Sequence, residues 1–210
     1  MGEEKYFIGI AGNIGVGKTT MTKKLAKDLG WQPYFESVID NPYLEDFYED
    51  MSRWSFNLQV YFLSHRYKSH KEMIKSPHST IQDRTIYEDV EIFARNLYKL
   101  DKMSKRDWDN YRELFGIMVE ELQAPDLIIY LKASVDTLLT RIERRSRDFE
   151  RKVDPEYLYR LNISYDKWIK KEKERHPVLI VDTNDFNIFN DTEDYQKIIN
   201  QIRKYCPEKD

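Results

Sequence analysis

The stretch FIGIAGNIGVGKTTMTKKLAKDL, from Phe7 to Leu29, contains the pattern G-x-x-x-x-G-K-[ST]. The chain has seven glycines, and three of them fall between positions 12 and 17. Glycine allows the tight turn in which successive backbone N–H groups point at phosphate oxygens. In this pattern the lysine contacts the β- and γ-phosphates, and the following hydroxyl binds Mg²⁺. We therefore expect a phosphate-binding loop formed by Gly12, Asn13, Ile14, Gly15, Val16, Gly17, Lys18, Thr19 and Thr20.

The residues on either side of the loop support this interpretation over an ordinary glycine-rich turn. Lys5–Ala11 is a short apolar run that predicts a buried strand. Thr19–Leu29 carries apolar residues at every fourth position from Met21, which is helical spacing, and Gly30 is a suitable helix end. A strand, a loop and a helix in this order form the context in which the pattern binds phosphate.

Length and composition narrow the class of protein. A chain of 210 residues predicts one domain, 1–210, with a substantial core. The net charge of −3 gives no reason to expect a nucleic-acid partner. The single cysteine, Cys206, excludes an internal disulfide, which suits a reducing cytoplasm. No apolar stretch resembles a signal segment or a membrane span, so we expect a cytoplasmic protein without a membrane partner.

Further short strand candidates alternate with helical segments along the chain. This alternation predicts an α/β fold with a parallel sheet covered by helices on both faces. In such sheets the ligand binds outside the carboxyl ends of the strands. The candidate strands are Pro33–Glu36, Ser79–Asp83, Asp126–Leu131 and Pro177–Val181.

The ends of these strands carry the parts of a phosphoryl-transfer site. One ends at the carboxylate Glu36, another at Asp83-Arg84-Thr85, and an arginine cluster from Arg141 to Arg147 follows the next after one helix. The strings D-x-x-G and N-K-x-D of GTPases are absent, and no long apolar strand ends in the acidic pair of motor ATPases. A third class, the kinases of small molecules, needs a deep acceptor pocket, a base for the hydroxyl and a closing lid.

Four segments resemble the deoxyribonucleoside kinases, most closely the deoxycytidine/deoxyguanosine/deoxyadenosine kinase branch. They are FESVIDNPYL (35–44), FYEDMSRWSFNLQVYFLSHR (47–66), IQDRTIYEDVEIFARNLY (81–98) and RRSRDFERKVDPEYLYRLN (144–162). The resemblance covers nearly the whole chain. It implies a P-loop kinase fold with a five-stranded parallel sheet, an arginine lid at about 142–152, and a homodimer. It also implies transfer of the ATP γ-phosphate to the 5′-hydroxyl of a deoxynucleoside, with Mg²⁺ as cofactor.

The resemblance assigns the catalytic and donor residues. Glu36 is the general base, kept ionised by Arg84, which also contacts the transferred phosphate. Asp83 joins Thr19 in holding Mg²⁺. Lys18 and Arg145 complete the catalytic set. The phosphates and the donor adenine are further contacted by Arg141, Arg145, Arg147, Asp185 and Phe186.

The resemblance also assigns the nucleoside site. Gln59 and Arg66 lie seven residues apart on one expected helix, Arg53–Ser76, and Asp89 and Phe93 share a face of a second, Tyr87–Leu100. Most aromatic residues at helical spacing pack in a core, so these roles compete with ordinary packing. The expected nucleoside contacts are Glu36, Val38, Phe47, Tyr48, Gln59, Phe62, Arg66, Arg84, Asp89, Phe93 and Glu150.

Two other functions remain open at this point. A nucleoside monophosphate kinase such as thymidylate kinase shares the loop, the Asp-Arg pair and the lid, but has no use for the Glu36 base. A non-catalytic nucleotide-binding regulator would not need Glu36 either. Among deoxynucleosides we expect deoxyadenosine first, because an ionised Asp89 held by Arg66 accepts a hydrogen bond from an amino group and repels the O4 of thymine. Deoxycytidine and deoxyguanosine follow, and thymidine is poorest.

Overall fold

The computed structural model describes residues 5–36, 41–145, 153–186, 188 and 191–207. The elements run in the order β1 (Phe7–Gly12), α1 (Lys18–Leu29), β2 (Gln32–Tyr34), α2 (Leu44–Glu49), α3 (Met51–Lys75), β3 (Thr80–Asp83), α4 (Ile86–Glu88), the π-helix η1 (Asp89–Ala94), α5 (Arg95–Lys99), α6 (Lys105–Val119), β4 (Leu127–Lys132), α7 (Val135–Arg145), α8 (Pro155–Glu172), β5 (Val178–Asp182) and α9 (Thr192–Tyr205).

The five strands form one parallel sheet in the order β2-β3-β1-β4-β5. Every residue of the central strand β1 is buried, which explains why the sequence shows an unbroken apolar run there. The register pairs Ile10 with Asp83 and Gly12 with Leu131. The carboxyl ends of β1, β3 and β4 therefore lie side by side, as the predicted sheet requires.

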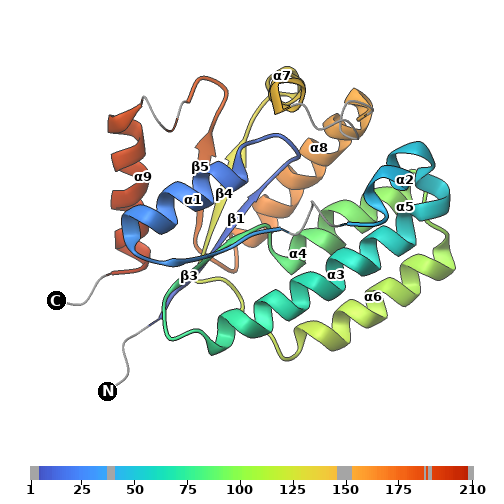
Figure 1. Ribbon diagram of the computed structural model, residues 1–210, viewed down its shortest axis with the longest axis horizontal. Coiled ribbons are helices and arrows are strands. Elements are labelled where there is room, and N and C mark those ends of the chain that lie inside the picture. The colour runs from blue at the N-terminus through green and yellow to red at the C-terminus, as the bar shows by residue number, and fades with distance from the viewer. Residues whose placement is uncertain (1–4, 37–40, 146–152, 187, 189–190, 208–210) are drawn as a thin grey trace.

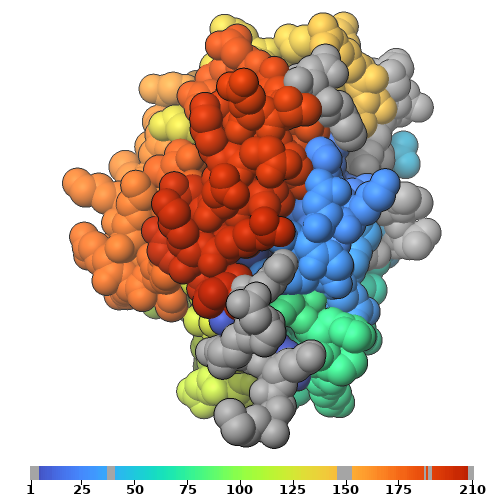
Figure 2. All heavy atoms as spheres, turned by 90° about the vertical axis from the view of Figure 1, so that its left-hand side faces the viewer, coloured from blue at the N-terminus to red at the C-terminus, as the bar shows by residue number. Residues whose placement is uncertain are grey.

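Helices cover both faces of the sheet. Helices α1 and α9 lie together on one face (Figure 1), where the Tyr195 hydroxyl donates to Asp28 at 2.8 Å. Figure 2 shows α9 covering much of this face beside α1. The other face carries α3, η1 and α8, with α6 packed outside α3 (Figure 1). The predicted five-stranded α/β fold is confirmed.

Most predicted boundaries differ from the structure by one or two residues, and two differences bear on the site. The second strand ends at Tyr34 rather than Glu36, so Glu36 lies two residues past the strand. The segment predicted as one helix from Tyr87 to Leu100 is broken by six residues of π-helix. A π-helix adds one residue to each turn, and a hydrophobic period read from so short a segment does not distinguish it from an α-helix.

In the described part of the chain, none of the helices combines the length and the apolar character that a membrane crossing demands. One contiguous core of buried residues extends from Ile8 on β1 to Cys206 after α9.

Candidate active site

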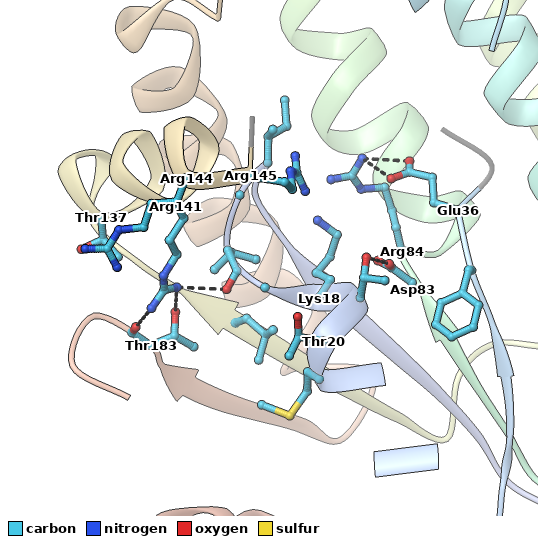
Figure 3. A pocket seen from close by; sticks show the side chains of 18 of the residues that line it. Lys18, Thr20, Glu36, Asp83, Arg84, Thr137, Arg141, Arg144, Arg145 and Thr183 are labelled. Carbon is cyan, nitrogen blue, oxygen red and sulfur yellow. Dashed lines mark hydrogen bonds and ion pairs between the residues drawn. The ribbon is translucent and has the colours of Figure 1, made fainter. Parts of the chain in front are cut away.

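A cavity of about 1250 Å³ opens at the carboxyl ends of the strands. The phosphate loop, the end of β3, α3, η1, α7 and the segment after β5 all contribute to its wall. Its volume exceeds that of a pocket for one small ligand, so it has room for two substrates. Figure 3 shows Lys18 between the arginines of α7 and the pair formed by Arg84 and Glu36.

The phosphate loop has the left-handed backbone that its glycines permit, with φ of 82° at Gly15 and 103° at Gly17. A Cβ atom on Gly15 would lie 2.8 Å from a side-chain carbon of Ile142, so the loop packs closely against α7. The buried Lys18 donates to the carbonyl of Asn13 at 3.0 Å. Burial, with a contribution from the positive charge of Arg84, lowers the pKa of Lys18 to about 8.

Two oxygen-bearing side chains lie together, Thr19 at the end of the phosphate loop and Asp83 at the end of β3. The Thr19 hydroxyl donates to Asp83 Oδ2 at 2.5 Å, and Asp83 Oδ1 is buried without a hydrogen-bond partner among the described residues. A carboxylate and a hydroxyl suit Mg²⁺, which binds through a few protein oxygens and takes the rest of its ligands from phosphates and water. Across the residues described, no group of three or more His, Cys, Asp and Glu side chains could hold a metal by itself. Thr19 and Asp83 therefore fit the magnesium of a bound nucleotide.

Glu36 is held by two arginines. Its carboxylate accepts from Arg66 at 2.9 Å and from Arg84 at 3.0 Å. Burial acts to raise the pKa of Glu36, but Arg84 and then Arg66 outweigh burial and lower the pKa to about 2. The contact predicted between Glu36 and Arg84 is present, and Arg66 adds a second cation.

The backbone at Arg84 is left-handed, with a φ of 65°, which is costly for a residue with a side chain. Two hydrogen bonds stabilise it: Arg84 N–H donates to Ile10 at 3.0 Å, and Arg66 donates to the Arg84 carbonyl at 3.0 Å. The guanidinium lies 4.3 Å from the centre of the Phe93 ring. This conformation directs Arg84 into the cavity between the phosphate loop and Glu36.

The part of the cavity next to α3 and η1 contains a buried ion pair. Arg66 Nε donates to Asp89 Oδ2 at 2.6 Å, and both side chains are at most 5% exposed. Burial raises the pKa of Asp89 to about 6, while Arg66 opposes the shift. The predicted pairing of these two residues is present. Nearby, Gln59 Oε1 is buried and has no hydrogen-bond partner within the described ranges.

Most of the predicted site residues line this one cavity. They are Ile14, Gly15, Val16, Gly17, Lys18, Thr19, Thr20, Glu36, Phe47, Tyr48, Gln59, Phe62, Asp83, Arg84, Asp89, Phe93, Arg141, Arg145, Asp185 and Phe186. Gly12, Asn13 and Arg66 are buried and are not among the residues that line the cavity. Val38, Arg147 and Glu150, and the lid segment 146–152, lie outside the described residues.

Helix α7 places its arginines differently from one another. Arg141 donates to the Val16 carbonyl at 3.1 Å and to the Thr183 hydroxyl at 2.9 Å, and it also donates to the Thr183 carbonyl. It thereby joins the phosphate loop to the end of β5 (Figure 3). Arg144 and Arg145 also line the cavity, at the end of the described part of the predicted lid.

Sequence reasoning missed cavity residues after β5 and one buried acid. Thr183 and Asn184 line the cavity after β5, where the rule about strand ends already pointed. Glu88 is fully buried beneath Arg84. Its signal was the spacing Thr85-x-x-Glu88, a capping box that the structure contains.

The sequence model of the deoxynucleoside kinase family matches residues 8–207. The chain belongs to the deoxynucleoside kinase family. It is 41% identical to the deoxyadenosine/deoxycytidine kinase of Bacillus subtilis, covering 93% of this chain and 90% of that protein. It is 40% identical to the deoxyadenosine kinase of Dictyostelium discoideum, over 87% and 74% of the two chains. A solved deoxyadenosine kinase from M. mycoides with bound dATP superposes with a TM-score of 0.82 at 31% identity, over 93% and 99% of the chains.

This kinase is therefore an ATP-dependent phosphotransferase that acts on deoxynucleosides. Family membership decides between the three functions that the sequence left open, against the monophosphate kinase and the non-catalytic regulator.

Proposed function

We propose that this kinase phosphorylates deoxyadenosine in preference to the other deoxynucleosides. The buried ion pair of Arg66 and Asp89 carries this proposal. Arg66 occupies Asp89 Oδ2, so Oδ1 is left to accept from the amino group of adenine or cytosine. The amide of Gln59, whose Oε1 has no hydrogen-bond partner among the described residues, reads the same base edge. The B. subtilis relative named for both deoxyadenosine and deoxycytidine agrees with a filter that selects an amino group.

The same pair disfavours thymidine. The O4 of thymine is an acceptor and would face the carboxylate of Asp89 across a dry contact. A mismatch that leaves buried polar groups unpaired discriminates by roughly 10⁴ or more in kcat/KM. Guanine also presents an acceptor, O6, in the place of the adenine amino group, so we rank deoxyguanosine below deoxyadenosine.

The residues divide the work of transfer as follows. The phosphate loop and Lys18 bind the ATP phosphates, and Thr19 and Asp83 hold Mg²⁺, which neutralises charge on the phosphates when bound. Glu36 orients the 5′-hydroxyl and accepts its proton. Arg84 and Arg145, with Arg147 of the lid, balance the charge that develops on the transferred phosphoryl group. Asp185 and Phe186 contact the donor adenine, and Tyr48 and Glu150 bind the sugar.

A panel of four deoxynucleosides tests the base preference. The wild-type enzyme is expected to show the highest kcat/KM for deoxyadenosine and the lowest for thymidine. The double variant Arg66→Met, Asp89→Ala removes both charges together and should raise the thymidine value relative to deoxyadenosine. A wild-type preference for thymidine, or unchanged ratios in the double variant, contradicts the proposed filter.

We also infer that the kinase, a single domain over 1–210, is a homodimer. The apolar side chains Ile74 on α3 and Ile117 on α6 are 38% and 63% exposed on two helices that pack against each other. Tyr67 and Lys71 of α3 reach Glu121 just after α6, so these two exposed residues lie toward the same end of the helix pair. Ile117→Glu should convert the dimer to a monomer in sedimentation, and a monomeric wild type refutes the inference.

The cytoplasm is the proposed location of the enzyme. Cys206 is a buried free thiol, which is consistent with a reducing compartment. The net charge of −3 gives no reason to propose a nucleic-acid partner.

A further inference from the structure

Glu88 is a buried acid with an unusual set of partners. It ends the three-residue helix α4 and is 0% exposed. Its Oε1 accepts from the Thr85 N–H at 2.9 Å. Its Oε2 accepts from the Gly12 N–H at 3.2 Å and from the Tyr165 hydroxyl at 2.7 Å, and Arg84 Nε lies 3.9 Å away.

Capping α4 does not account for this arrangement. A capping box needs one carboxylate oxygen, and Oε1 supplies it. Burying an ionised carboxylate is unfavourable unless it is well paired. Burial raises the pKa of Glu88, and the nearby Arg84 and Lys18 oppose that shift. The second carboxylate oxygen, Oε2, therefore has a role outside the cap. Its hydrogen-bond partners show which parts of the site it connects.

The partners of Oε2 belong to both halves of the site. Gly12 begins the phosphate loop: its N–H donates to Glu88, and its carbonyl accepts from Arg84 at 3.4 Å. Arg84 in turn holds Glu36 at 3.0 Å. A continuous set of contacts thus connects the donor phosphate loop, through Glu88 and Arg84, to the carboxylate at the 5′-hydroxyl.

Glu88 also adjoins the base-reading helix. The next residue, Asp89, begins η1 and forms the buried pair with Arg66. Tyr165, the hydroxyl donor to Glu88, lies edge-on to Phe93 of the same π-helix at 6.4 Å between ring centres. A shift of the Glu88 carboxylate therefore acts on the phosphate loop, the arginine and the nucleoside wall together.

We propose that Glu88 is a positioning residue for phosphoryl transfer: its buried carboxylate fixes Arg84 relative to the phosphate loop and couples ATP binding to deoxynucleoside binding. The proposal rests on the roles given above to Arg84 and Glu36. It adds that a single buried carboxylate connects the half of the cavity that binds the phosphate donor with the half that binds the acceptor. Glu88 need not touch either substrate for this.

Glu88→Gln is the direct test, because the amide keeps the volume and one acceptor for Thr85. It loses the negative charge and places an N–H opposite the N–H of Gly12. We expect kcat to fall about 10–100-fold, as for other residues that orient a catalytic group, while the Kd of the nucleoside alone changes less than about threefold. The nucleoside used is whichever gives the highest kcat/KM in the panel above.

Coupling between the two binding sites distinguishes a positioning residue from a merely structural one, because replacing a merely structural residue would leave the coupling unchanged. Calorimetry measures the nucleoside Kd with and without a β,γ-methylene analogue of ATP. The wild-type ratio is expected to be about fivefold or more, and Glu88→Gln should bring it close to one. The control is Glu91→Gln, the same change on η1, because Glu91 pairs with Arg95 and does not line the active-site cavity.

A second variant covers the case in which Glu88→Gln does not fold. Tyr165→Phe keeps the ring stacked on Tyr130 and removes only the hydroxyl that donates to Glu88. A smaller fall in kcat and in the coupling ratio is expected. A variant that folds and keeps both the wild-type kcat and the wild-type ratio overturns the proposal. The ratio is a binding measurement, so it stands even if Glu36 is not the base.

Discussion

Replacing Glu36 with glutamine is expected to keep the fold and nearly abolish turnover. Glutamine has the same shape but does not accept the proton of the 5′-hydroxyl. Loss of a general base costs roughly 10²–10⁴ in kcat, or about 3–5 kcal/mol in the barrier. The fold survives because Arg66 keeps Asp89 at 2.6 Å and Arg84 keeps Glu88 at 3.9 Å as counter-charges.

The low pKa of Glu36, about 2, shapes this prediction. So weak a base does not take a proton from a free hydroxyl. As the proposed base, Glu36 would take the proton only as the 5′-oxygen bonds to phosphorus, when the hydroxyl becomes strongly acidic. Glu36 should therefore stay ionised throughout the working range of pH, and kcat should show no acid limb that belongs to Glu36.

The variant also separates a base from a residue that binds ATP. Removing one anion beside Arg66 and Arg84 leaves the arginines more attractive to phosphate, so the ATP Kd should be unchanged or tighter. Steady-state kinetics at saturating substrates gives kcat, calorimetry gives the Kd, and circular dichroism confirms folding. The matched control is Glu45→Gln, an exposed acid on α2. A near wild-type kcat for deoxyadenosine in Glu36→Gln would refute the assignment of the base.

Other perturbations test the donor loop, the pH response and a glycine. Lys18→Ala should remove activity while calorimetry still detects deoxynucleoside binding, because only the β- and γ-phosphate contact is lost; loss of both ligands would place the two sites wrongly. The kcat/KM for deoxyadenosine should rise with pH through about 6 as Asp89 ionises and becomes an acceptor, and Asp89→Asn should lack this limb. The kcat/KM for ATP should fall above pH 8 as Lys18 loses its proton, and a flat alkaline profile contradicts the assignment. Gly15→Ala should weaken ATP binding because its Cβ meets Ile142 at 2.8 Å, whereas Gly116→Ala in α6 has open space and should raise stability by about 0.4–1 kcal/mol in thermal unfolding.

The sequence alone determined the phosphate loop, the order of strands and helices, and the family resemblance. These features are local: a glycine-rich turn between a strand and a helix, apolar runs of strand length, and short motifs in order. Their physical cause lies within a few neighbouring residues, as at Lys18 and Thr19, so reading along the chain was enough. The pairing of Arg66 with Asp89 was also predicted, because the resemblance placed both beside the base.

Only the tertiary structure decided which charged side chains of the site pair with one another. Arg66 bonds Asp89, Glu36 and the Arg84 carbonyl at once, although these partners lie in two segments, at residue 36 and at residues 84–89, that are far from Arg66 in the sequence. The left-handed backbone of Arg84 and the link from Glu88 to Gly12 also depend on contacts with the neighbouring strand β1. Burial raises the pKa of Asp89 and lowers that of Lys18, whereas Arg84 and Arg66 overcome burial and lower the pKa of Glu36. Burial and these charge contacts are properties of the packed whole. The sequence shows which ionisable groups are present. Their protonation and the direction of their side chains depend on the low-dielectric space that distant segments enclose together.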